Sequence, residues 1–428
     1  MVRLAARRGA AARGDPVKSP PIAEFALEPA PAISEAAQRV AALVGARITD
    51  GDAFFSAEAM RIARLCANMA DRFARGGRLI AVGSTPAARS DVRHVAVEFV
   101  HPVIVGKRAL PAFGIMADGG EINDRVALLV SPDDIILAFG ACDEALPLEA
   151  AVATARARGC LTIADGVVGA DVEFRAPTTD AFTWQELVET LYHVLWELVH
   201  VFFEHEGKRG SVEAHHPGGA AFLYPFLTGG SADLETIMED VARSVLMKAR
   251  ESADLRRRTV LADHGEIILR AAALARQRLD AGGTVLAFGN GGSATDAMDI
   301  VADMRTPPRE LRFAPRRALD LTDDPAILTA LANDVSTDVL FARQIIAYGT
   351  ARDVAIGFST SGSSRNVIAA FEEARRRDLL TIAFVGYDGG RIAAERLADY
   401  VVVTPSQYVP RIQEAQATAY HLLRTLVG

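Results

Sequence analysis

Residues 285–293 read Val-Leu-Ala-Phe-Gly-Asn-Gly-Gly-Ser, and this stretch decides the fold of the chain. Four consecutive apolar residues are typical of a short strand buried on both faces of a parallel sheet. The glycine-rich turn ends that strand, and a helical pattern begins near Ala294. The stretch therefore predicts a strand–turn–helix unit of an α/β protein.

The first half of the chain repeats this unit. Leu79-Ile-Ala-Val82 precedes a glycine, just as Val285–Phe288 does. Further along, Gly159-Cys-Leu-Thr-Ile-Ala164 matches Asp378-Leu-Leu-Thr-Ile-Ala383, and each half ends in a long amphipathic helix. Short apolar strands that alternate with helices predict two tandem copies of one α/β domain, each a parallel sheet with helices on both faces.

Composition and charge narrow the class of protein. The chain has 428 residues, and 46 Lys and Arg stand against 54 Asp and Glu, for a net charge of −8. This balance argues against nucleic acid as the main ligand. The 3 cysteines exclude a disulfide framework, and no apolar run approaches the roughly 20 residues of a membrane span. We therefore expect a cytoplasmic protein with neither a membrane nor a nucleic-acid partner.

Two irregular stretches suggest the domain limits. Residues 1–32 mix Arg, Ala and Pro without periodicity, which predicts a disordered N-terminal arm. Residues 206–233 are rich in Gly, Pro and His and predict a linker. The two domains are expected at residues 33–205 and 234–428.

Two turns of the second half have the composition of a phosphate site. Like the first turn, Ser359-Thr-Ser-Gly-Ser-Ser364 follows a strand and precedes a helix. Glycines let the backbone approach an anion, and the amides at a helix N-terminus point at it. One such turn would be read as an ordinary turn or helix cap. Two at the carboxyl ends of strands in one sheet favour phosphate binding, with the candidates Asn290, Gly291, Gly292, Ser293, Ser359, Thr360, Ser361 and Ser364.

Together with Gly386-Tyr-Asp-Gly-Gly390 and Arg411-Ile-Gln-Glu414, these turns resemble the sugar isomerase (SIS) domain, and within it the phosphoheptose isomerases and their DnaA-associated relatives. The resemblance covers the second half nearly end to end. It implies a flavodoxin-like sheet, a phosphosugar ligand and, in the single-domain enzymes, a tetramer. Phosphoheptose isomerases convert sedoheptulose 7-phosphate to a heptose 7-phosphate, generally with zinc. This chain would then be a dimer that resembles a tetramer of SIS domains.

The resemblance also implies a metal site, made in the family by a His, a Glu one helical turn later, and a Gln and a His two turns apart. The first half matches all of these positions, with His94, Glu98, Gln185 and His193. The second half offers an alternative set, Asp299, Asp303, Gln413 and His421. His94 and Glu98 share one helix face. Gln185 and His193 lie about 12 Å apart along a helix, so they meet one ion only if it lies between them or if two copies meet.

The two halves have lost complementary features. In the first half, Gly83-Ser-Thr-Pro-Ala-Ala88 and Gly140-Ala-Cys-Asp-Glu144 stand in place of the phosphate turns. Asp143 and Glu144 would repel a phosphate there. This pattern predicts one composite site, with metal and acid–base residues from the first half and phosphate turns from the second.

By resemblance, Glu98 and His193 would move protons between two carbons of the sugar, while zinc polarises the carbonyl. Asp334 and Gln413 complete the expected substrate contacts. The chain has no G-x-G-x-x-G turn, so no nucleotide cofactor is expected. The alternative is a non-catalytic phosphosugar sensor or scaffold, which Asp299 and Asp303 favour and the intact first-half set opposes.

Overall fold

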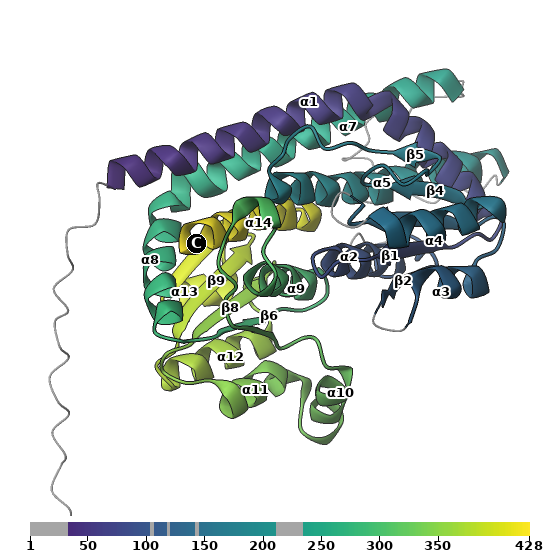
Figure 1. The fold of residues 1–428 in the computed structure, drawn as a ribbon. Coiled ribbons are helices and arrows are strands. Elements are labelled where there is room, and N and C mark those ends of the chain that lie inside the picture. Colours follow the sequence, from purple (N-terminus) through teal and green to yellow (C-terminus); the bar gives the residue numbers. More distant parts are fainter. Residues whose placement is uncertain (1–32, 103–106, 118–119, 142–144, 211–233) are drawn as a thin grey trace, which may run out of the picture.

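Each half of the chain forms one five-stranded parallel sheet (Figure 1). The computed structural model describes residues 33–102, 107–117, 120–141, 145–210 and 234–428. The strands of the first sheet lie in the order β2-β1-β3-β4-β5 and those of the second in the order β7-β6-β8-β9-β10, which is the same topology. This is the flavodoxin-like order. The expected fold, two tandem α/β units, is confirmed.

Helices alternate with the strands in both halves. The first half contains α1 (Ile33–Ala74), β1 (Leu79–Gly83), α2 (Ala88–Val100), β2 (Ala112–Met116), α3 (Ile122–Leu129), β3 (Ile135–Phe139), α4 (Ala145–Ala157), β4 (Leu161–Ala164), β5 (Val172–Glu173) and α5 (Ala181–Gly210). The second half contains α7 (Leu234–Arg256), the π-helix η3 (Arg257–His264), α8 (Gly265–Asp280), β6 (Val285–Phe288), α9 (Gly292–Arg305), η4 (Arg309–Leu311), β7 (Ala318–Asp320), α10 (Pro325–Asp334), η5 (Thr337–Val339), α11 (Leu340–Tyr348), β8 (Val354–Ser359), α12 (Arg365–Arg376), β9 (Leu380–Gly386), α13 (Gly390–Ala394), β10 (Tyr400–Thr404) and α14 (Val409–Val427).

An equivalent buried aspartate joins the two central strands in each half. Asp134, just before β3, accepts a hydrogen bond of 2.9 Å from the backbone N–H of Arg78, just before β1. Asp353, just before β8, accepts one of 2.7 Å from the backbone N–H of Thr284, just before β6. The repeated Asp therefore sets the register of the central strand pair, and the carboxyl ends of these strands meet at one edge of each sheet.

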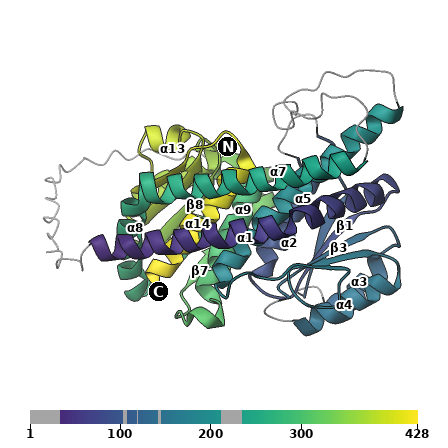
Figure 2. The ribbon, with the colours of Figure 1, turned by 90° about the horizontal axis from the view of Figure 1, so that it is seen from above.

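Two long helices tie the halves together. Helices α1 and α7 lie side by side and run across both sheets (Figures 1 and 2). Val40 and Val44 of α1 belong to the hydrophobic core of the second half. In return, Val241 and Val245 of α7 belong to the core of the first half. The limits expected from the sequence separate the two sheets, but the packing of these helices crosses those limits.

Two of the expectations concern the N-terminal arm and the linker, and a third concerns a membrane span. Residues 1–32 and residues 211–233 of the expected linker lie outside the described residues. Helix α5 continues to Gly210, so residues 206–210 are helical. In the described part of the chain, no helix combines the length and the apolar character that crossing a bilayer requires.

The turn that follows α8 packs closely against the chain just before β8, and substitution of Gly283 tests this packing. A Cβ at Gly283 would overlap the backbone carbonyl oxygen of Arg352, which cannot move aside. Gly283→Ala should therefore lower the free energy of unfolding by about 1–3 kcal/mol, measured by urea denaturation. The matched control is Gly45→Ala in α1, where the new methyl meets open space, and it should raise stability by about 0.5–1 kcal/mol. Equal effects of the two substitutions would contradict this packing.

Candidate active site between the halves

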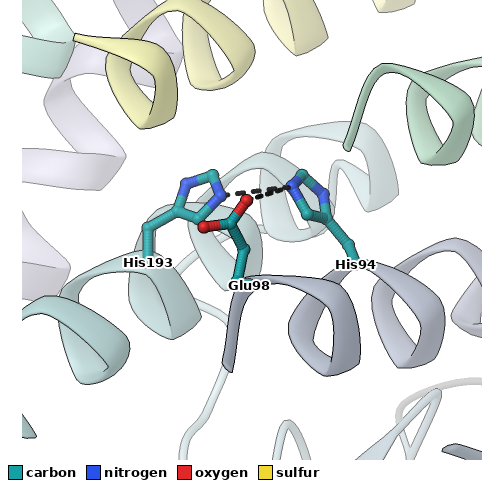
Figure 3. A group of neighbouring side chains, drawn as sticks. All are labelled: His94, Glu98 and His193. Atoms are coloured by element: carbon teal, nitrogen blue, oxygen red, sulfur yellow. Dashed lines mark hydrogen bonds and ion pairs between the residues drawn. The ribbon is translucent and has the colours of Figure 1, made fainter. Parts of the chain in front are cut away.

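His94, Glu98 and His193 meet in one buried cluster (Figure 3). His94 and Glu98 come from consecutive turns of α2, and His193 comes from α5. The Nε2 atom of His94 lies 3.3 Å from Nε2 of His193 and 3.9 Å from Oε1 of Glu98. One ligand atom from each residue lies within 4.8 Å of the others. The structure thus brings together three of the four residues of the expected metal set.

The glutamine beside this cluster comes from the other half. Gln413 of α14 places its Nε2 atom 3.1 Å from Nε2 of His94. Gln185 of α5 instead donates a hydrogen bond to Asp299 of α9. Gln185 therefore lies with the second cluster and not beside His193, because two turns of α5 separate these side chains by about 12 Å. The spacing of the glutamine and the histidine on one helix requires two copies of the domain to meet, and the two halves of this chain serve as those copies.

A second cluster is related to the first by the duplication. Asp299 and Asp303 of α9 lie with carboxylate oxygens 3.3 and 3.4 Å from Nε2 of His421 on α14. Glu186 of α5 lies 3.0 Å from the other ring nitrogen. Burial alone lowers the pKa of His421, but the neighbouring carboxylates of Asp299, Asp303 and Glu186 outweigh it and hold the pKa well above its ordinary value. Asp299, Asp303 and His421 also lie close enough together to hold one metal ion, and within the described residues Nε2 of His421 and both carboxylate oxygens of Asp303 are buried without a hydrogen-bond partner.

Residues that the sequence did not single out orient the histidines of the first cluster. The Tyr192 hydroxyl lies 2.9 Å from Nδ1 of His94. A carboxylate oxygen of Glu414 lies 3.0 Å from Nδ1 of His193. With both Nδ1 atoms engaged, the two Nε2 atoms are turned toward each other. This is the arrangement in which an outer hydrogen-bond partner positions a metal-binding imidazole.

A repeated sequence pattern could have revealed these partners. The dipeptide Gln-Glu occurs at residues 185–186 and 413–414, and a Tyr-His pair follows each at residues 192–193 and 420–421. Each member of the repeat makes the corresponding contact in its own cluster: Tyr420, for example, donates a hydrogen bond of 2.6 Å to Asp299. Comparison of the two halves, position by position, would have found the pattern.

The first cluster fits a divalent cation. Burial, reinforced by the neighbouring His193, lowers the pKa of His94 well below its ordinary value, so its ring is neutral and keeps a lone pair. Burial also raises the pKa of Glu98 to about 7. Within the described residues, Oε2 of Glu98 and Oε1 of Gln413 are buried without a hydrogen-bond partner. Nitrogen and oxygen ligands of this kind suit zinc, and a bound cation would satisfy the unpartnered oxygens.

The first phosphate turn of the second half lies against this cluster. A Cβ at Gly292 would overlap Nε2 of Gln413 and lie 3.0 Å from Nε2 of His94. The backbone of this turn therefore lies directly beside the side chains of Gln413 and His94. Asn290 in this turn and Asn366 at the start of α12 exchange two hydrogen bonds of 2.9 and 2.8 Å, which joins the two phosphate turns.

The second phosphate turn gathers hydroxyl groups. Ser359 Oγ lies 3.2 Å from Ser364 Oγ and 3.5 Å from Ser361 Oγ. No side chain caps the N-terminus of α12, which begins after Ser364, and none caps α9, which begins after Gly291. Helix N-termini left open beside hydroxyl donors have the character of an anion site. Ser293 and Thr360, the remaining candidates, lie in the same two turns.

One expected substrate contact lies apart from the clusters. Asp334 is exposed at the end of α10 and accepts a hydrogen bond of 2.7 Å from Asn333. In the part of the chain that the structure describes, it makes no hydrogen bond to either cluster. Asp143 and Glu144, expected to repel phosphate in the first half, fall outside that part.

The buried ion pairs between the halves predict how stability depends on pH. Burial alone raises the pKa of Glu186, but Arg47 and His421 outweigh it and bring the pKa to about 2, below the ordinary value of 4.5. A lowered pKa stabilises the fold above pH 4.5, and this contribution is lost as the pH falls from 4.5 to about 2. In Glu186→Gln, the slope of unfolding free energy against pH near about pH 3 should fall by about 1 kcal/mol per pH unit.

Urea denaturation between about pH 2.5 and 6 measures this slope. The control is Glu395→Gln, which removes an exposed carboxylate paired with Arg391. Solvent screens that pair, so the slope should stay nearly unchanged. Identical slopes for wild type and Glu186→Gln would show that the carboxylate does not titrate as the structure requires.

The exchange of glutamines between the halves can be tested by metal content. Gln413→Ala should lower zinc affinity by about 10- to 100-fold, because it removes a group beside His94. Gln185→Ala makes the same change in the other cluster and should leave zinc affinity nearly unchanged. Zinc is measured by elemental analysis after dialysis against a graded chelator series. A larger loss of zinc affinity in Gln185→Ala than in Gln413→Ala would instead support the grouping of Gln185 with His193 that the sequence predicts.

Comparison with known proteins places the chain in a family. Residues 250–386 match the family model described as SIS domain. The phosphoheptose isomerase of Thermodesulfovibrio yellowstonii is 44% identical over 165 residues, which cover 38% of this chain and 79% of that protein. That of Aquifex aeolicus is 41% identical over 178 residues, which cover 42% of this chain and 91% of that protein.

Distant solved structures share the tandem fold over most of the chain. The C-terminal domain of glucosamine-fructose-6-phosphate aminotransferase from Francisella tularensis covers 90% of this chain and 94% of its own, with a TM-score of 0.55 and 9% identity. The tagatose-6-phosphate ketose/aldose isomerase of Escherichia coli covers 92% of both chains, with a TM-score of 0.53 and 13% identity. By sequence and by fold, the chain belongs to the SIS-domain family and is related to the phosphoheptose isomerases.

Proposed function

We propose that the chain is a phosphosugar aldose–ketose isomerase of the phosphoheptose isomerase type, which converts sedoheptulose 7-phosphate to a heptose 7-phosphate. One observation supports it above all: the open phosphate turns of the second half lie against the His–Glu cluster of the first, with Gly292 beside His94. A sugar held by its phosphate at Ser359, Ser361 and Ser364 would extend its carbonyl end toward that cluster. Neither half alone holds both parts of this site.

The side chains of the cluster have roles that suit this reaction. Isomerisation takes a proton from one carbon and returns it to the next through an enediol, which requires a base that works near neutral pH. Glu98, whose pKa burial raises to about 7, is the proposed base. His193, held at Nδ1 by Glu414, exchanges the proton with the sugar oxygens through Nε2. When zinc is bound, His94, one oxygen of Glu98 and Gln413 would hold it, which leaves Nε2 of His193 for the proton, and the metal would polarise the carbonyl.

A non-catalytic phosphosugar sensor or scaffold is the second candidate function. The observation that favours it is the second cluster, where Asp299 and Asp303 stand at the positions that His94 and Glu98 hold in the first. The proposed site uses the other cluster, so this change does not remove it. A dimer of the chain, equivalent to four SIS domains, is proposed as its assembly.

Turnover of sedoheptulose 7-phosphate by zinc-loaded protein, followed by NMR, tests the function. Glu98→Gln should lower kcat by about 10²- to 10⁴-fold, because it removes the base. Ser361→Ala should act mainly by raising KM, because it removes a donor to the phosphate. Glu266→Gln is the control and should leave both constants within about twofold of wild type, since Glu266 is an exposed residue of α8 paired with Arg270.

The same preparation distinguishes the two functions. Wild-type protein that binds the sugar phosphate, measured by calorimetry, but shows no turnover with or without zinc would overturn the isomerase and favour the sensor. Turnover that survives Glu98→Gln unchanged would overturn the assignment of the base.

A further inference from the structure

A cavity of about 340 Å³ lies at the carboxyl edge of the first sheet, and Pro308 and Glu310 of the second half also line it. Its walls are the turns after β1, β3 and β4, with Thr85, Gly140 and Asp165, and the first turns of α5, with Trp184 and Gln185. The duplication relates this cavity to the phosphate turns of the second half. Its volume is that of a site for a small organic molecule.

The backbone amides that would bind a phosphate here are already used by the chain itself. Asp165 accepts hydrogen bonds of 2.9 Å from the backbone N–H groups of both Gly140 and Ala141. Thr85 Oγ1 accepts one of 3.1 Å from the N–H of Ala88, the first residue of α2. The carboxylate of Asp165 thus occupies the position of an anionic ligand. In the second half, among the described residues, the positions before α9 and α12, Gly291 and Ser364, make no side-chain capping hydrogen bond.

The charge of the walls also disfavours an anion. Asp91, Asp180 and Glu310 line the cavity along with Asp165, and none of the described residues that line it is Lys or Arg. A phosphate monoester would face the carboxylates of Asp165, Asp180 and Glu310 with no Lys or Arg among the described lining residues, while burial raises the pKa of Asp91 well above its ordinary value. Hydroxyl and ammonium groups are donors, and carboxylates accept from them.

The wall from α5 suits a sugar ring. Trp184 is 6% exposed and contributes an aromatic surface to the cavity. Its indole N–H is buried away from solvent, so the surface that it offers a ligand is apolar. Gln185, on the same face, connects the cavity to Asp299 of the second cluster.

We propose that this cavity is a second ligand site, which takes a small unphosphorylated sugar or amino sugar, and that Asp165 excludes phosphate esters from it. The chain then has one phosphosugar site and one site of different specificity, at two places that the duplication made alike. The proposal does not rest on isomerase activity, because the cavity lies apart from the proposed catalytic cluster.

Tryptophan fluorescence provides the test, since the chain has 2 tryptophans and the other, Trp196, is fully buried. The probes are glucosamine and glucosamine 6-phosphate, and Trp184→Phe gives the background. Glucosamine should change the Trp184 signal saturably in wild type. Glucosamine 6-phosphate should act at least about 100-fold more weakly, because like charges would face each other. No Trp184 response to glucosamine, or an equal response to both probes, would overturn the proposal.

Asp165→Ala tests the excluding residue, because it frees both amides. In this variant glucosamine 6-phosphate should act on Trp184 at least as strongly as glucosamine does. Asp180→Asn is the matched control: it removes one negative charge from the wall but leaves the amides of Gly140 and Ala141 occupied. If Asp180→Asn shifted the preference from glucosamine toward glucosamine 6-phosphate as far as Asp165→Ala does, the charge of the wall alone would set that preference. The hydrogen bonds from Asp165 to the backbone amides would then have no part in it. If Asp165→Ala does not fold, the comparison of the two probes on wild type still decides the proposal.

Discussion

Two carboxylate–histidine pairs that cross between the halves hold the molecule together at its centre. Glu186 of α5 faces His421 of α14, and Glu414 of α14 faces His193 of α5, each at 3.0 Å and each buried. A buried charge without a partner is very costly. A shift of one half relative to the other would therefore expose both pairs to solvent or leave their buried charges without partners. Gln185 directly precedes Glu186, and Gln413 directly precedes Glu414. The pairing of each carboxylate with a histidine of the other half therefore also places the preceding glutamine in the cluster of that histidine.

One duplicated geometry supports two chemistries. In the first cluster, a neutral His94 and an unpartnered oxygen of Glu98 leave space that a cation can fill. In the second, Asp299 and Asp303 stand in place of His94 and Glu98, and both lie beside His421. The phosphate turns diverge in the opposite sense: they are open in the second half and filled by a carboxylate in the first. Since each cluster draws residues from both halves, one site could change while the other kept its parts.

The sequence predicts the sheets well because a strand that is covered on both faces must be apolar throughout. Apolar runs such as Ile135–Phe139 are fully buried, and their repetition revealed the duplication. The phosphate turns were equally visible, because their glycines and serines are required locally. The partners of α1 and α7 were not visible. An amphipathic pattern shows that a helix has an apolar face, but Val40 and Val241 could each have packed on their own half as well as on the other.

The sequence by itself determined the fold and the duplication, because strand burial, helix periodicity and turn geometry are local properties. Only the tertiary structure decided which half supplies each group to a cluster. Helix pitch keeps Gln185 about 12 Å from His193. Contact between α5 and α14, which no spacing along the chain encodes, brings Gln413 to His94 in its place.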